Sequence, residues 1–125
     1  MSARGLLVVG AVSASVAVAA GAFGAHGLQG RIPPDLVEVW DTGARYQMVH
    51  ALALVTLAAL AGRWPGGAWS AAGWLFLAGT VLFSGSLYLL AATGIRWLGA
   101  ITPFGGAAFL AGWVVVAVTG WRTLG

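Results

Sequence analysis

The sequence predicts an all-α protein embedded in the membrane as an up-down four-helix bundle. Hydrophobic residues make up 60% of the 125 residues, and the mean hydropathy is +0.93. Only 7% of the residues are charged, against about 25% in soluble domains, so lipid must be the solvent for most of the surface. Four long apolar runs alternate with short polar or turn-forming segments. The length leaves room for a single integral membrane domain, residues 1–125.

The four apolar runs are the predicted membrane spans. They cover about residues 5–24, 46–62, 68–92 and 97–121. The first run, of roughly 20 residues, reaches about 30 Å as a helix, which is the thickness of a hydrocarbon core. A cleaved signal peptide is the alternative interpretation, but its apolar part would be only about 7–15 residues long. We therefore expect the first helix to be retained.

Short turns set the relative directions of the last three spans. Pro65-Gly66-Gly67 follows the second span and Gly94 follows the third. Helices joined by short turns run antiparallel, so both termini are expected on one side. Pro103 lies within the fourth run, where proline can kink a membrane helix. Tryptophans near the span ends are expected to anchor at the interfaces, and these are Trp40, Trp64, Trp69, Trp97 and Trp121.

The segment between the first two spans, residues 25–45, is the most polar part of the chain. Pro34 suits the first turn of a helix, and Asp35 and Glu38 would follow near its positive end, where anions are favoured. Apolar residues such as Leu36 give this piece an apolar side. We expect a short amphipathic interfacial helix over about residues 34–44, which runs into the second span.

Charge and cysteine usage exclude several classes of function. The formal net charge is +3, but the six arginines are spread along the whole chain and there is no lysine. A nucleic-acid surface needs a basic patch, so no nucleic-acid partner is expected. Cysteine is absent, which excludes disulfides, thiolate metal sites and thiol nucleophiles.

No motif indicates catalysis, and we expect the protein not to be an enzyme. Ser84-Gly85-Ser86 lacks the strand–turn–helix context of a hydrolase nucleophile. No span holds a pair of carboxylates, and the glycines lie inside apolar runs, where their usual role is helix packing.

Polar groups within lipid are costly and call for a reason, and here they converge on one side of the membrane. Thr42, Tyr46 and His50 form one helical stripe, and Thr80, Ser84 and Tyr88 form another. Asp41 and Arg45 are spaced to form an ion pair, and Arg45 is expected to be partly buried. The predicted polar cluster consists of His26, Asp41, Arg45, Tyr46, Gln47, His50, Ser84 and Tyr88.

This cluster has four interpretations at the level of sequence. It can be a hydrogen-bonded network that fixes the interfacial helix to the bundle, or a site for a ligand or lipid headgroup, since arginine and aromatic side chains suit anionic headgroups. Proton or ion handling is a third interpretation, because histidine titrates near neutral pH. The fourth is b-type haem ligated by His26 and His50. No metal-binding spacing is present, and no cofactor is expected.

Four blocks of sequence resemble the signature blocks of a known family. They are residues 21–28 (GAFGAHGL), 40–54 (WDTGARYQMVHALAL), 83–88 (FSGSLY) and 101–106 (ITPFGG). The family is domain-of-unknown-function family 423, which includes transmembrane protein 256 of eukaryotes. The resemblance covers nearly the whole chain and implies a small multi-pass protein of the bacterial inner (plasma) membrane. It implies no established activity, substrate or cofactor.

The functional hypothesis is a non-enzymatic structural, accessory or lipid-interacting membrane component. Membrane lipids are the expected partners, and a homo-oligomer or a larger membrane complex is a further expectation. The alternatives are a carrier of protons or small molecules, or a haem- or metal-binding protein that uses His26 and His50.

Overall fold

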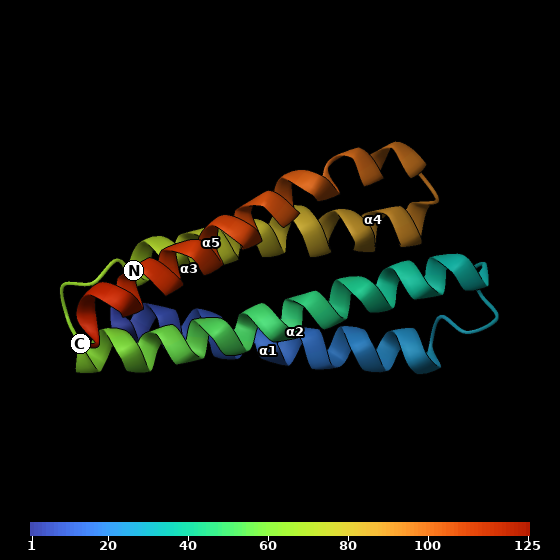
Figure 1. The fold of residues 1–125 in the computed structure, drawn as a ribbon. Helices are drawn as coiled ribbons and strands as arrows, with labels where there is room; N and C mark the ends of the chain where they lie inside the picture. Colours follow the sequence, from blue (N-terminus) through green and yellow to red (C-terminus); the bar gives the residue numbers. More distant parts are fainter.

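A computed structural model describes residues 1–125 and confirms an all-α bundle of four membrane-length helices. Figure 1 shows two layers, with α1 beside α2 in one and α3, α4 and α5 in the other, and both termini at the same end. The elements are α1 (Ala3–His26), α2 (Pro34–Arg63), α3 (Trp69–Gly79), the π-helical turn η1 (Thr80–Ser84), α4 (Gly85–Thr93), the 3₁₀ turn η2 (Arg96–Ala100) and α5 (Thr102–Thr123).

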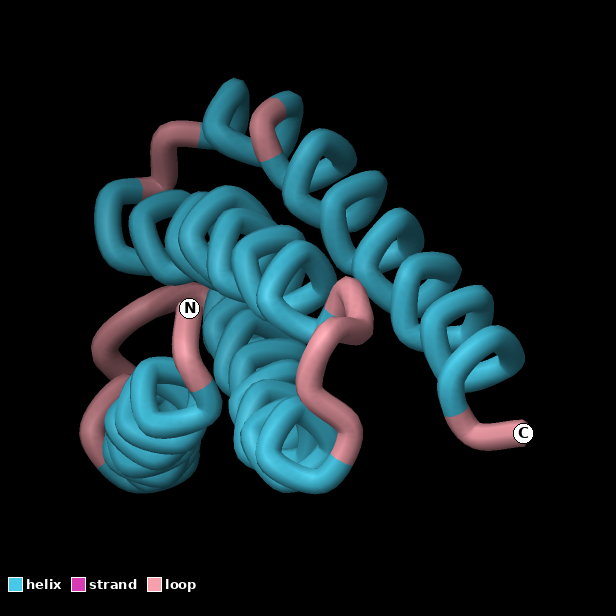
Figure 2. Tube along the Cα trace, turned by 90° about the vertical axis from the view of Figure 1, so that its left-hand side faces the viewer, coloured by secondary structure: helices cyan, strands magenta, loops and turns pink.

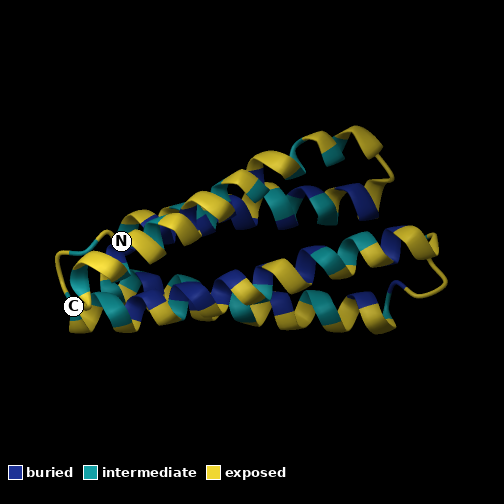
Figure 3. Ribbon diagram, viewed as in Figure 1, coloured by how far each residue is buried: buried dark blue, intermediate teal, exposed yellow.

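The helix α2 lies at the centre of the bundle. It packs along α1 on one side and against α3, η1 and α4 on the other, while α5 packs mainly against α3 and η1. Seen along the helix axes, α1 and α5 therefore occupy opposite flanks (Figure 2). Buried residues face the space between the layers, and the outer faces are exposed (Figure 3). Those outer faces are rich in aliphatic and aromatic side chains, as a surface solvated by lipid must be.

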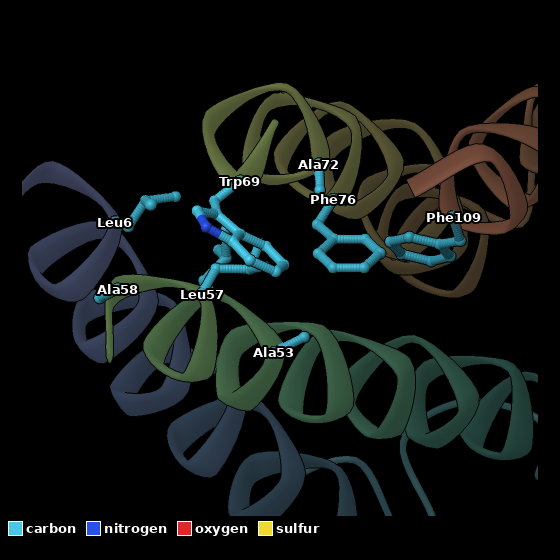
Figure 4. Close-up of a cluster of buried hydrophobic side chains, with 9 residues drawn as sticks. Leu6, Ala53, Leu57, Ala58, Trp69, Ala72, Phe76 and Phe109 are labelled. Atoms are coloured by element: carbon cyan, nitrogen blue, oxygen red, sulfur yellow. The ribbon is translucent and has the colours of Figure 1, made fainter. Parts of the chain in front are cut away.

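The largest apolar core lies towards the end of the bundle that holds the termini. It joins Leu6 of α1, Leu57 of α2, Trp69 and Phe76 of α3, and Phe109 of α5 (Figure 4). Trp69 is only 2% exposed and its Nε1 donates to the backbone O of Trp64 at 3.0 Å. It is therefore a core residue, and the prediction that it anchors at the interface is wrong.

Tryptophans at the opposite end also divide between packing and exposure. Trp40 packs against Phe23 and Tyr88, and its Nε1 donates to the backbone O of Ala20 at 2.7 Å, so it joins α2 to α1. Trp97 is 68% exposed and suits the role of an anchor.

Residues 34–44 form the first three turns of α2, and no break separates them from the predicted second span. No proline follows Pro34 within the helix, and the Thr42 hydroxyl donates to the backbone O of Glu38 at 2.9 Å, inside the helix. Thirty helical residues extend about 45 Å, the thickness of a bilayer with its headgroups. The polar beginning of α2 therefore lies at the depth of the headgroups when the apolar remainder spans the hydrocarbon.

Two local features of the third and fourth spans were not predicted. The third span contains the π-helical turn η1, in which the N–H of Gly85 bonds to the O of Thr80. Pro103 stands in the first turn of α5, after the 3₁₀ turn η2. Pro103 therefore begins a helix and does not kink one. The N–H groups of a first helical turn have no partner within the helix, so the missing N–H of proline costs no hydrogen bond there.

Glycine allows α5 to approach η1 closely. A Cβ at Gly105 would come within 2.7 Å of the Cβ of Phe83 and closer still to the Phe83 backbone N. Backbone atoms cannot move aside as a flexible side chain can. The contact between the fourth and third spans therefore requires glycine at this position.

We predict that Gly105→Ala lowers the free energy of unfolding by about 1–3 kcal/mol through overpacking. The matched control is Gly120→Ala on the same helix, where an added Cβ meets nothing within 4 Å. Because alanine has the higher helix propensity, the control is expected to be neutral or to stabilise by up to about 1 kcal/mol. Thermal unfolding in detergent measures both, and equal behaviour of the two variants would contradict the close packing.

Candidate functional site

A hydrogen-bond network centred on Gln47 connects three helices. Its Nε2 donates to both the backbone O and the Oγ of Ser13 on α1, each at 3.2 Å, and its Oε1 accepts from the Tyr88 hydroxyl of α4 at 2.6 Å. Close by, Ser84 Oγ donates to the backbone O of Gly43 at 2.7 Å. Gln47 is 6% exposed and Ser84 is 0% exposed. Every buried side-chain polar atom has a partner, which suits a structural role for this network.

His50 belongs to a second group, in which its ring is surrounded by aromatic side chains. The Trp113 Nε1 donates to His50 Nε2 at 3.0 Å, and His50 Nδ1 lies 2.7 Å from the backbone O of Tyr46. Indole N–H can only donate and a carbonyl can only accept, so the imidazole is neutral and carries its hydrogen on Nδ1. Phe109 stacks on the ring with 3.6 Å between centroids. Both ring nitrogens are therefore engaged, and neither is free to ligate a metal.

A hollow of about 460 Å³ opens on the lipid-facing side of this aromatic group, between α2 and α5. Its walls include the aromatic side chains of Tyr46, Phe83 and Trp113, and Gly106 of α5 also lines it. Tyr46 is 44% exposed there and packs against Phe83 with 4.6 Å between centroids. The walls are mainly apolar and carry no formal charge.

The ion pair between Asp41 and Arg45 forms a third, separate group on the surface. Arg45 Nη2 lies 2.5 Å from Asp41 Oδ2, and the side chains are 71% and 54% exposed. The predicted pairing is confirmed, but the expectation that Arg45 is partly buried is wrong. Its position on α2 turns it away from α4, because the side of α2 that faces α4 carries Gly43 and Gln47.

These two charged residues line a hollow of about 410 Å³ between the end of α1 and the beginning of α2, here called the α1–α2 hollow. It is lined by Gly24, Ala25, Gln29, Val37, Glu38, Asp41, Thr42 and Arg45. The Glu38 carboxylate has no ion-pair or hydrogen-bond partner. The carbonyl oxygens of Gly24 and Ala25, in the last turn of α1, accept no hydrogen bond.

The predicted cluster therefore resolves into separate parts. Gln47, Ser84 and Tyr88 form the interior network, Tyr46 and His50 belong to the aromatic group, and Asp41 and Arg45 line the α1–α2 hollow. His26 is exposed at the end of α1 and joins none of them.

The structure also separates the two histidines that the haem interpretation needs. Gln47, one turn before His50 on α2, contacts Ser13 of α1. Ser13 and His26 are thirteen residues apart on the same helix, or about 20 Å along its axis. His26 and His50 of one chain therefore do not ligate the same haem iron.

Sequence reasoning missed four residues that the structure assigns to these groups. Ser13 has a signal in the sequence as a polar residue within a span, and Glu38 has one as an acid near the start of a helix. The carbonyl of Gly43 and the indole of Trp113 gave no signal, because their partners lie 41 and 63 residues away along the chain.

Comparison with known proteins gives a family without an assigned activity. The family described as "Protein of unknown function (DUF423)" matches residues 20–106, and this match confirms the resemblance. The matched range includes every residue that lines the α1–α2 hollow. The chain is 54% identical over 85 residues to the UPF0382 membrane protein YwdK of Bacillus subtilis, covering 67% of this chain and 69% of that protein. It is 44% identical over 90 residues to a UPF0382 membrane protein of Staphylococcus aureus, covering 67% and 68%. No solved structure matches.

We predict that Gln47→Leu lowers the free energy of unfolding by about 1–2 kcal/mol, because it leaves the partly buried Tyr88 hydroxyl without its acceptor. In the Tyr88→Phe background, Gln47→Leu should lower the free energy of unfolding by a smaller amount, because no hydroxyl remains to lose its acceptor. Thermal unfolding in detergent of the two single variants and the double variant gives this coupling directly. Additive effects would contradict a shared network, and exposed Thr56→Val on the same helix is the control expected to change little.

Proposed function

Because the chain belongs to the DUF423 family, whose curated relatives are named membrane proteins, we propose its role from the geometry of its polar end. It is a non-enzymatic component of the bacterial inner membrane that binds a phospholipid through its headgroup. The binding site is the α1–α2 hollow.

The observation that carries this proposal is a charged hollow beside the polar beginning of α2, in a chain that has few other charges. Three of the nine charged side chains of the protein, Glu38, Asp41 and Arg45, line it. They lie within residues 34–45, at the beginning of α2, and we place this polar end of the helix at the level of the headgroups. A lipid bound there keeps its tails against the apolar outer faces of α1 and α2.

The chemistry of the hollow favours binding over catalysis. A catalytic nucleophile needs a base within hydrogen-bond reach, and the only hydroxyl here, that of Thr42, donates to the backbone O of Glu38. Arg45 uses one terminal nitrogen to pair with Asp41. Its remaining N–H groups are free to donate to a phosphate, which guanidinium recognises well.

A carrier function based on His50 has less support from the geometry. Proton transfer through this ring would have to break its bond with Trp113 or with the Tyr46 carbonyl. The network around Gln47 is fully paired, which supports a scaffold role that holds α1 and α2 in the register that forms the hollow.

The test is phospholipid retention by the purified protein, measured by native mass spectrometry from detergent and from nanodiscs. We expect at least one phospholipid to stay bound, and Ala25→Trp, which fills the α1–α2 hollow, to release it. Ala22→Trp is the matched control, because Ala22 is an exposed α1 residue outside the hollow. Arg45→Gln should weaken retention while leaving the unfolding temperature nearly unchanged, since its ion pair is exposed.

Two results would overturn the proposal. One is a wild-type protein that retains no phospholipid under conditions that keep it folded. The other is equal retention by Ala25→Trp and Ala22→Trp. The same spectra report the number of chains in each particle, which tests the expected oligomer separately.

A further inference from the structure

We propose that the α1–α2 hollow selects a zwitterionic phospholipid with a primary amine, of the phosphatidylethanolamine class. This inference rests on the proposed function and specifies its ligand. Three features of the hollow carry it: the sign of its charge, its free acceptors and the absence of aromatic side chains from its walls.

The charge of the hollow is opposite in sign to that of the whole chain. Arg45 contributes +1, and Glu38 and Asp41 contribute −1 each, so the lining sums to −1, whereas the chain carries +3. A headgroup with only a negative charge, such as phosphatidylglycerol, gains Arg45 but faces two carboxylates. A headgroup that carries an ammonium beside its phosphate matches both signs.

The residues that line the hollow include three free acceptor groups, the same number as the N–H donors of a primary ammonium. Glu38 has an unpaired carboxylate, and the carbonyls of Gly24 and Ala25 accept no hydrogen bond. These carbonyls also belong to the C-terminal end of α1, where the helix dipole favours a cation. The ammonium is placed between Glu38 and the end of α1, and the phosphate beside Arg45.

The lining also distinguishes a primary amine from a quaternary one. A choline headgroup has no N–H to donate, and proteins recognise it with aromatic side chains around the cation. None of the eight lining residues is aromatic. Phosphatidylcholine therefore lacks both means of recognition in this hollow.

The experiment is competition between phosphatidylethanolamine, phosphatidylglycerol and phosphatidylcholine with identical acyl chains, measured by native mass spectrometry of the full chain. We expect phosphatidylethanolamine to bind about tenfold more tightly than either competitor, as one charge-assisted hydrogen-bonded contact provides. Glu38→Gln should reduce this preference to near unity while binding persists through Arg45. Asp35→Asn makes the same change of charge one turn earlier on α2, outside the hollow, and should leave the preference intact.

Each other outcome has a defined meaning. Retention of all three lipids without preference overturns the selectivity and leaves the proposed function standing, whereas retention of none overturns both. Loss of preference in Asp35→Asn as well as Glu38→Gln would assign the selectivity to the general surface charge and overturn the site. Soluble glycerophosphoethanolamine that competes as strongly as the lipid would overturn the commitment to a membrane ligand.

Discussion

The amide of Gln47 joins the two layers of this bundle at their centre, and much of the arrangement depends on it. Lipid gives apolar helices little reason to prefer one another, so a polar contact that cannot be satisfied by solvent sets which faces meet. One amide bonds to Ser13 of α1 and Tyr88 of α4 at once. One turn away, Ser84 Oγ donates to the Gly43 carbonyl. Only one rotation of α2 about its axis allows both the Gln47 bonds and the Ser84–Gly43 bond to form.

That rotation decides the position of every other polar residue on α2. The side chains of Gln47 and His50 face the interior, so Glu38, Asp41 and Arg45 face away from α4 and form the α1–α2 hollow. These three residues lie near the beginning of α2, at the end of the bundle opposite the two termini. The network and the hollow are thus two sides of the same helix: one fixes the fold, and the other is available to a ligand.

Small residues let the helices reach these contacts. Gly105 brings α5 against the π-helical turn η1, and Phe109, on the next turn of α5, stacks on His50. Trp113 completes this group from a further turn along α5 and holds His50 in its neutral form. The aromatic group is therefore a packing arrangement between α2 and α5 that has no free imidazole nitrogen.

The sequence alone determined the class of fold, because apolar runs of membrane length and a shortage of charge admit no soluble alternative. It also determined the antiparallel order, through the turns at Pro65 and Gly94, and the Asp41–Arg45 pair, whose spacing is local. Only the tertiary structure decided which polar residues of different helices meet, since Gln47 and Tyr88 are 41 residues apart and Trp113 lies 63 residues beyond His50. Periodicity places residues on a face of one helix, but the rotation of that helix against its neighbours depends on contacts between distant parts of the chain.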